Sequence, residues 1–207
     1  MMTEPHAPAR VRIPVFAALI AYVFAMRVLP YILHRGFGMD VEYAYSAFPW
    51  NFSPIYAIAI FGGAFFTTRL ALLLPIAVYF VSDMTIALLM GADWGFYRSQ
   101  PITYAAFALL AACGMPLRER RSIAPIAVAG LGGAVMFFLV TNFGVWLVGG
   151  GLSHPKTPAG LMQCYVDGVP FFTRTLISQA LFLPVLFSPL VLARTTARAE
   201  DTTASFS

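Results

Sequence analysis

Charge is scarce in this 207-residue chain: Asp, Glu, Lys and Arg make up 11% of it, while hydrophobic residues make up 59%. A water-soluble domain covers its surface with polar and charged side chains, and a chain with a mean hydropathy of +0.77 does not supply enough of them. No polar block is long enough to form a separate soluble domain. The composition therefore predicts an all-α protein with a single integral membrane domain.

Residues that carry chemistry are also few. The two cysteines, Cys113 and Cys164, form no CxxC pair, and the three histidines have neither metal-ligand nor haem-ligand spacing. We therefore expect no metal and no cofactor. Neither a GxSxG motif nor a Walker A glycine loop is present, so we expect no enzyme and no ATPase. The net charge of +4 is scattered among loops, as membrane insertion requires, so nucleic acid is not an expected partner.

Breaking the sequence at its charged and Pro/Gly-rich segments predicts six transmembrane helices, at about 13–33, 51–67, 70–90, 101–116, 123–148 and 170–193. The first stretch is too long for the apolar part of a signal peptide, so we expect it to remain as a span. Residues 13–193 then form the transmembrane domain, residues 1–12 an N-terminal tail and residues 194–207 a disordered tail.

Arginines mark one side of this topology. They precede the first span, follow the sixth, and lie in the short loops after spans two and four, whereas the other three loops are longer and carry fewer basic residues. By the positive-inside rule both termini are cytoplasmic. We expect a multi-pass protein in the lipid bilayer of the bacterial inner membrane, with long outer loops that form a lid.

Asp83, in "YFVSDMTIALLM", is the most informative polar residue, because a carboxylate at membrane depth faces the bundle interior and pairs with a cation or lines a wet cavity. Two interpretations remain open. Asp83 forms an internal ion pair with Arg174 or Arg27, or it lines an outward-open pocket and contacts a ligand.

Asn142, in "FFLVTNFGVWLVGGG", raises the same question within span five. It either bonds a neighbouring helix or, with Trp146 four residues on and on the same helical face, offers an amide beside an aromatic plane to a ligand. An interfacial anchor is the alternative for Trp146. The candidate ligand-binding residues are Asp83, Asn142, Trp146, Arg174, Asn51 and Tyr104.

A stripe of small residues lies on span one. Ala17, Ala21 and Ala25 recur at four-residue spacing in "FAALIAYVFAM", and such stripes permit close helix approach. The stripe packs either inside this bundle or against another membrane subunit.

The strings "NFSPIYAIAIFGGAFF", "VSDM", "FFLVTNFGVWL" and "PKTPAGLMQCYVDGVPFF", together with six spans and the alanine stripe, resemble an uncharacterised bacterial family similar to the S components of energy-coupling factor vitamin transporters. This resemblance implies an S-component-like bundle that binds a vitamin-like small molecule between the outer loops. It also implies that the alanine stripe docks on a transmembrane coupling subunit driven by ATPases.

Two functions follow as expectations. The first is a substrate-binding membrane protein for uptake of a small vitamin-like solute, with Asp83, Asn142, Trp146 and Arg174 in contact with the ligand near the outer face. The alternative is a structural or accessory subunit of a larger membrane complex, which the alanine stripe, the apolar surface and the missing catalytic motifs favour.

Overall fold

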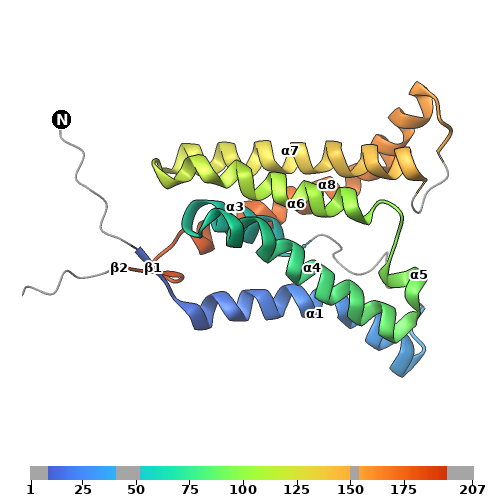
Figure 1. Cartoon of the computed structure of the whole chain (residues 1–207), viewed down its shortest axis with the longest axis horizontal. Helices are drawn as coiled ribbons and strands as arrows, with labels where there is room; N and C mark the ends of the chain where they lie inside the picture. The colour runs from blue at the N-terminus through green and yellow to red at the C-terminus, as the bar shows by residue number, and fades with distance from the viewer. Residues whose placement is uncertain (1–8, 41–51, 150–153, 195–207) are drawn as a thin grey trace, which may run out of the picture.

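The computed structural model describes residues 9–40, 52–149 and 154–194, and these form a helical bundle (Figure 1). The elements are β1 (Ala9–Val11), α1 (Ile13–Phe37), α3 (Ile55–Phe65), α4 (Thr68–Met90), α5 (Ala92–Gly95), α6 (Gln100–Gly114), the 3-10 helix η1 (Met115–Arg118), α7 (Ile123–Val148), α8 (Pro158–Leu186) and β2 (Leu192–Arg194).

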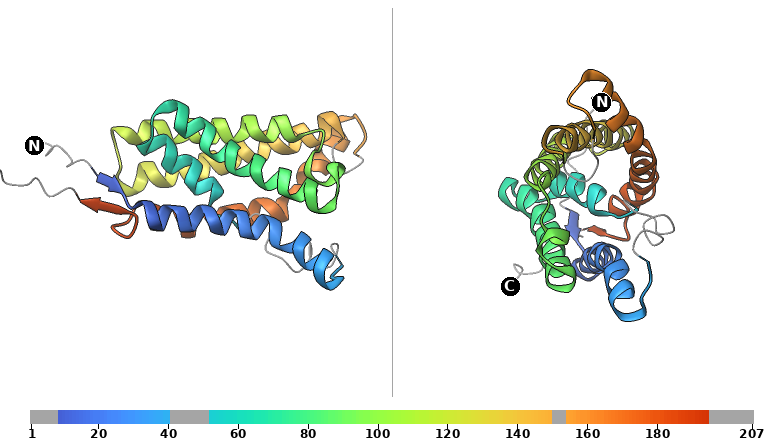
Figure 2. Two further views of the ribbon diagram at one scale, coloured as in Figure 1. Left: turned by 60° about the horizontal axis from the view of Figure 1, so that its bottom comes forward. Right: turned by 90° about the vertical axis from the view of Figure 1, so that its right-hand side faces the viewer.

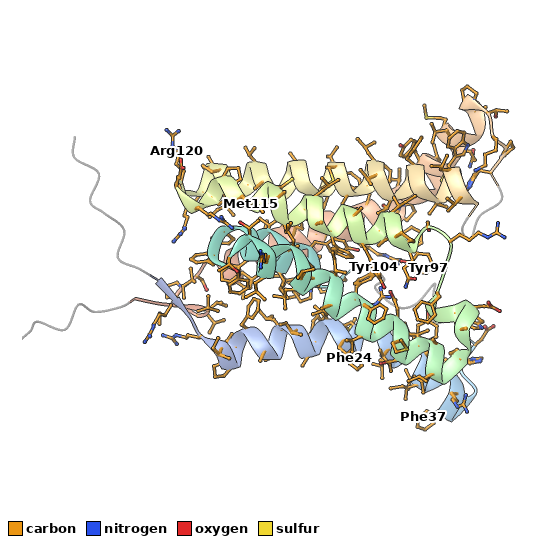
Figure 3. The ribbon with its side chains drawn as sticks, viewed as in Figure 1. Phe24, Phe37, Tyr97, Tyr104, Met115 and Arg120 are labelled. Atoms are coloured by element: carbon orange, nitrogen blue, oxygen red, sulfur yellow. The ribbon has the colours of Figure 1, made fainter. Side chains whose placement is uncertain are left out.

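The first and last described segments pair with each other. Strands β1 and β2 are antiparallel, with Val11 opposite Leu192, and the Arg12 amide extends the pairing by donating to the Val191 carbonyl at 2.7 Å. Both strands lie at one end of the bundle, called here the termini end, and Arg120 between α6 and α7 lies at the same end (Figures 1 and 3). Phe37 marks the opposite, far end (Figure 3). Which membrane face each end occupies stays a prediction.

Five helical segments of the described chain are long and apolar enough to cross a bilayer, namely α1, α4, the run from α5 to η1, α7 and α8. Large apolar side chains cover their outward faces, Leu73, Leu88 and Val128 among them, as expected where helices meet lipid. The chain is therefore a multi-pass membrane protein, and the predicted all-α class is confirmed to that extent.

The second predicted span, at 51–67, is not confirmed, because α3 has 11 residues and rises only about 17 Å, against about 30 Å of hydrocarbon. Residues Ile55 to Ala64 are all buried. In the view along the long axis, α3 lies between the pair α1–α4 and the pair α7–α8 (Figure 2). The apolar stretch at 51–67 therefore supplies a central core helix of half the membrane thickness.

Close backbone contact holds α3 against α6. A side chain at Gly63 would lie 2.0 Å from the Ala111 carbonyl oxygen, and one at Gly114 would lie 1.9 Å from the Ile60 carbonyl oxygen. Next to this crossing, the Tyr56 ring lies 5.8 Å from that of Phe107, centroid to centroid. Two glycines facing each other's helix thus set the depth to which α3 sinks into the bundle.

The predicted outer loop at 149–169 needs correction as well. Helix α8 begins at Pro158, where Thr157 caps it by accepting a hydrogen bond from the Gly160 amide at 3.1 Å. Proline at the first helical position and threonine before it are a common helix start. Residues 158–169 are consequently helical, and Cys164 is buried on α8.

Candidate functional site

Asp83 lies on α4 with 1% of its surface exposed, and both of its carboxylate oxygens are engaged. Oδ1 forms an ion pair with the Arg27 guanidinium from α1. Oδ2 accepts hydrogen bonds from Gln100 Nε2 and from the Tyr104 hydroxyl, each at 2.8 Å and both from α6. Figure 3 shows Tyr104 near the start of α6. A buried carboxylate with three donors around it is fully compensated.

The arginine is held equally closely. Arg27 Nε donates to Ser82 Oγ at 2.7 Å, and the guanidinium carbon lies 3.5 Å from the centre of the Tyr79 ring. We call Arg27, Ser82, Asp83, Gln100 and Tyr104 the charge network. It ties α1, α4 and α6 together by polar contacts.

Of the two interpretations of Asp83, the geometry shows an internal ion pair, and the partner is Arg27. Arg174, the other candidate partner, lies half-buried on α8. Tyr104, another candidate ligand-binding residue, lies next to Asp83, as expected if the two belonged to one site. Gln100 was missed in the sequence, although a polar residue next to the proline that starts a helix was a usable signal. Asn51 lies outside the described residues.

A cavity of about 230 Å³ lies between α7 and α8 in the half of the bundle nearer the far end, and we call it the far-end cavity. Four phenylalanines line it, and its polar side chains include an amide, a carboxylate and two hydroxyls. The lining residues are Ala134, Phe137, Phe138, Thr141, Asn142, Val145, Asp167, Gly168, Phe171, Phe172 and Thr175.

Asn142 is a polar residue of α7 that lines this cavity. Its Nδ2 donates to the Phe138 carbonyl at 2.8 Å, one turn earlier on α7. Its Oδ1 faces Gly168 on α8, where an added Cβ would lie only 2.4 Å away. Gly168 therefore gives the carboxamide its space, and the Asn142 side chain is directed at the partner helix and the cavity, away from lipid.

Asp167 is the charged residue that lines the far-end cavity. Its Oδ2 lies 2.9 Å from His154 Nε2 and its Oδ1 accepts from Gln163 Nε2 at 2.7 Å. The aspartate side chain is 39% exposed and His154 is 6% exposed. The His154 Nδ1 atom is buried without a hydrogen-bond partner among the described residues. The carboxylate that lines the cavity is therefore solvent-accessible, and it contacts a histidine whose other ring nitrogen has no partner among the described residues.

Trp146 lies outside the far-end cavity, near the end of α7. It lies one turn beyond Asn142, and its indole Nε1 donates to the Pro155 carbonyl at 2.9 Å. Lys156 donates back to the Trp146 carbonyl, and its ammonium lies 5.1 Å from the indole centre. Trp146 thus fastens the segment before α8 to the end of α7. It does not line the far-end cavity, and neither does Arg174.

The candidate residues consequently fall into two groups. Asp83 and Tyr104 belong to the charge network on α1, α4 and α6, whereas Asn142 belongs to the far-end cavity between α7 and α8. Helix α6 packs against both α4 and α7 and so lies between the two groups. The convergence of all these residues in one pocket, which the sequence suggested, is not what the described residues show.

The alanine stripe faces outward. Ala17, Ala21 and Ala25 are all exposed, while Phe16 and Val23 of the same helix are buried against the core. The alanine stripe therefore does not pack against another helix within the described part of the bundle.

The chain was compared with curated proteins, with solved structures and with protein-family models. No curated protein matches it, and no solved structure matches it. Nothing in these comparisons links it to S components. The model of one family, described as a family of unknown function (DUF6580), matches residues 8–201. Since that match spans nearly the whole sequence, the chain belongs to this family.

Proposed function

We propose that the protein is a substrate-binding membrane protein for uptake of a small vitamin-like solute, which binds in the far-end cavity. The observation that carries this proposal is an amide and a carboxylate, Asn142 and Asp167, facing one cavity between two apolar helices. Polar side chains at membrane depth are costly, so they are concentrated where a ligand or an ion needs them.

The cavity limits the size and chemistry of the solute. A volume of about 230 Å³ lies below the roughly 300–1,000 Å³ of sites for drug-sized molecules. Corrins are too large for it. The phenylalanine wall favours a flat ring, the Asn142 amide can pair with a ring carbonyl or ring N–H, and Asp167 favours a donor or a positive charge. A nucleobase or a single-ring vitamin meets these conditions.

Orientation and partners complete the proposal. The arginines of the α6–α7 turn, Arg118, Arg120 and Arg121, lie with the chain ends, which favours a cytoplasmic termini end in the bacterial inner membrane. The far-end cavity then opens toward the outer face. The exposed alanine stripe supports docking on a transmembrane coupling subunit with ATPases, since the chain has no ATP-binding motif of its own.

The test is ligand-dependent stabilisation of the protein in lipid nanodiscs. Nucleobases and single-ring vitamins are screened by thermal unfolding, and we expect at least one to raise the midpoint, because a ligand at 100 times its Kd adds about 2.7 kcal/mol. Asn142→Leu should abolish the shift. Thr173→Val serves as control, because Thr173 is exposed on α8 and does not line the cavity. An unshifted wild-type protein, or a full shift in Asn142→Leu, contradicts the proposal.

A second candidate is an accessory subunit of a larger membrane complex, and the outward-facing alanine stripe favours it. Co-purification in mild detergent distinguishes the two functions, since an accessory subunit assembles stoichiometrically without ligand. Ala21→Trp should break such an assembly. Ala112→Trp, at an exposed alanine on α6 away from the stripe, should not. Recovery of the free chain from cells at every ionic strength and detergent tested argues against this candidate.

A further inference from the structure

A second and larger cavity, of about 740 Å³, opens between α7 and α8 at the termini end, and we call it the termini-end cavity. Its wall on α7 runs from Ile123 to Leu131, and on α8 it runs from Leu176 to Phe187. Eight residues of helix rise about 12 Å, so the cavity runs roughly that far along α7. Nearly all of the side chains in this wall are apolar.

Gln179 is the exception inside the wall. Its side chain is 3% exposed, and neither its Nε2 nor its Oε1 has a hydrogen-bond partner among the described residues. Leaving a buried amide unpaired costs about 1–3 kcal/mol, and native structures seldom accept that cost without a ligand or water to meet it. The group that completes this site must both accept a hydrogen bond from Nε2 and donate one to Oε1.

Arg121 stands at the rim of the same cavity. Its guanidinium lies 4.3 Å from the centre of the Phe65 ring, and its Nε donates to the Leu117 carbonyl at 3.2 Å, so its position is fixed. Gln179 is eight residues from Phe187, which lines the cavity near that end, and therefore lies about 12 Å deeper along α8. The cavity thus presents a cation at one end, a long apolar wall, and one amide farther along.

We propose that the termini-end cavity binds an elongated, mainly apolar carboxylate that carries a hydroxyl at its other end. The carboxylate pairs with Arg121, the hydrocarbon body lies against the apolar wall, and the hydroxyl exchanges two hydrogen bonds with Gln179. A hydroxyl both donates and accepts, as the unpaired amide requires.

Bilayer lipids and simple fatty acids fit these groups less well. An ester carbonyl of a phospholipid only accepts hydrogen bonds and would leave Gln179 Oε1 unpaired. A fatty acid would place its methyl end against the amide and leave both atoms unpaired. The match of donor, acceptor and charge therefore selects the hydroxylated carboxylate.

The experiment is titration calorimetry on the full chain in nanodiscs, with empty nanodiscs as the reference for partitioning into the bilayer. The probes are ω-hydroxydecanoate, decanoate, which lacks the hydroxyl, and decane-1,10-diol, which lacks the charge. We expect ω-hydroxydecanoate to bind the wild-type protein about tenfold more tightly than decanoate, since hydrogen bonds in a buried site are worth about that factor.

Variants test each contact separately. Gln179→Leu should bind both acids equally, whereas Arg121→Gln should bind ω-hydroxydecanoate and the diol equally. Ala127→Phe fills the cavity and should abolish binding of all three probes. Ala124→Phe, one turn earlier on α7 and outside the cavity wall, should leave binding unchanged.

The inference is overturned if the wild-type protein shows no saturable heat above empty nanodiscs, which would make bilayer lipid the occupant. It is equally overturned if Gln179→Leu keeps the preference for the hydroxylated acid. Failure of this inference and failure of the proposed function are distinguishable. The variants used here change residues of the termini-end cavity, whereas Asn142→Leu changes the far-end cavity.

Discussion

Alanine at Gly63 should destabilise the protein far more than alanine at the adjacent Gly62. At Gly63 the new Cβ would lie 2.0 Å from the Ala111 carbonyl oxygen and 3.0 Å from the backbone of Gly114. At Gly62 the nearest atom would be Phe66 Cδ2, at 3.4 Å, which is ordinary contact. Backbone atoms cannot rotate away as a side chain can, so only the first substitution forces α3 and α6 apart.

The expected magnitude follows from these distances. Restoring ordinary contact at Gly63 needs a separation of about 1.4 Å, the difference between 3.4 Å and 2.0 Å. Overpacking of this kind costs about 1–3 kcal/mol or more. Replacing a helical glycine by alanine also stabilises a helix by about 1 kcal/mol, and this gain applies at both positions. Gly62→Ala should therefore be neutral or slightly stabilising, and the two variants should differ by the overpacking cost, about 1–3 kcal/mol or more.

The assay is the free energy of unfolding, measured by steric trapping in bicelles. Gly132→Ala on α7 is the reference for the propensity gain, because nothing lies within 4 Å of its added Cβ. Equal stabilities for Gly62→Ala and Gly63→Ala, within about 0.5 kcal/mol, would refute the description of α3 as a helix held by backbone contact.

Three further predictions concern the polar contacts. In the charge network, Arg27→Met and Asp83→Asn should each lower the free energy of unfolding by about 3 kcal/mol or more. The double variant should lose less than the sum of the two single losses. Strict additivity would mean that the two residues are not coupled. Gly168→Ala should cost about 1–3 kcal/mol by displacing the Asn142 side chain. Adding Asn142→Ala to that variant should recover much of the loss, and a double-mutant cycle without such recovery would contradict the contact. Trp146→Phe should speed amide hydrogen exchange at the start of α8, because the indole bond to the preceding segment is lost; unchanged exchange rates there would show that the bond does not hold that segment.

Helix positions were predictable where the chain marks their ends. The prediction of 123–148 matches α7, because Arg120 and Arg121 precede it and Gly149, with φ +69°, follows it. The stretch at 51–67 has no such marks. Its apolar composition suits both a full span and a buried half-length helix, and only the packing around α3 distinguishes them.

Asp83 was predictable as a key residue because a carboxylate inside an apolar span is rare. Its partner was not, since the sequence left both Arg27 and Arg174 as possible partners. The choice depends on α1 packing against α4, which a sequence without an alignment does not contain. Asp167 was missed for a related reason, because Pro158 was interpreted as part of a loop although it begins α8.

The β1–β2 pair makes the chain nearly circular, since its last described strand returns to its first. A short peptide that joins the two strands, combined with new ends cut elsewhere, should preserve the bundle, as for other domains with adjacent termini. The same ribbon also means that α1 is anchored at two points, by α4 along its length and by β2 at its beginning. A force applied to the alanine stripe would accordingly be transmitted to α8 through the joined ends as well as through the core.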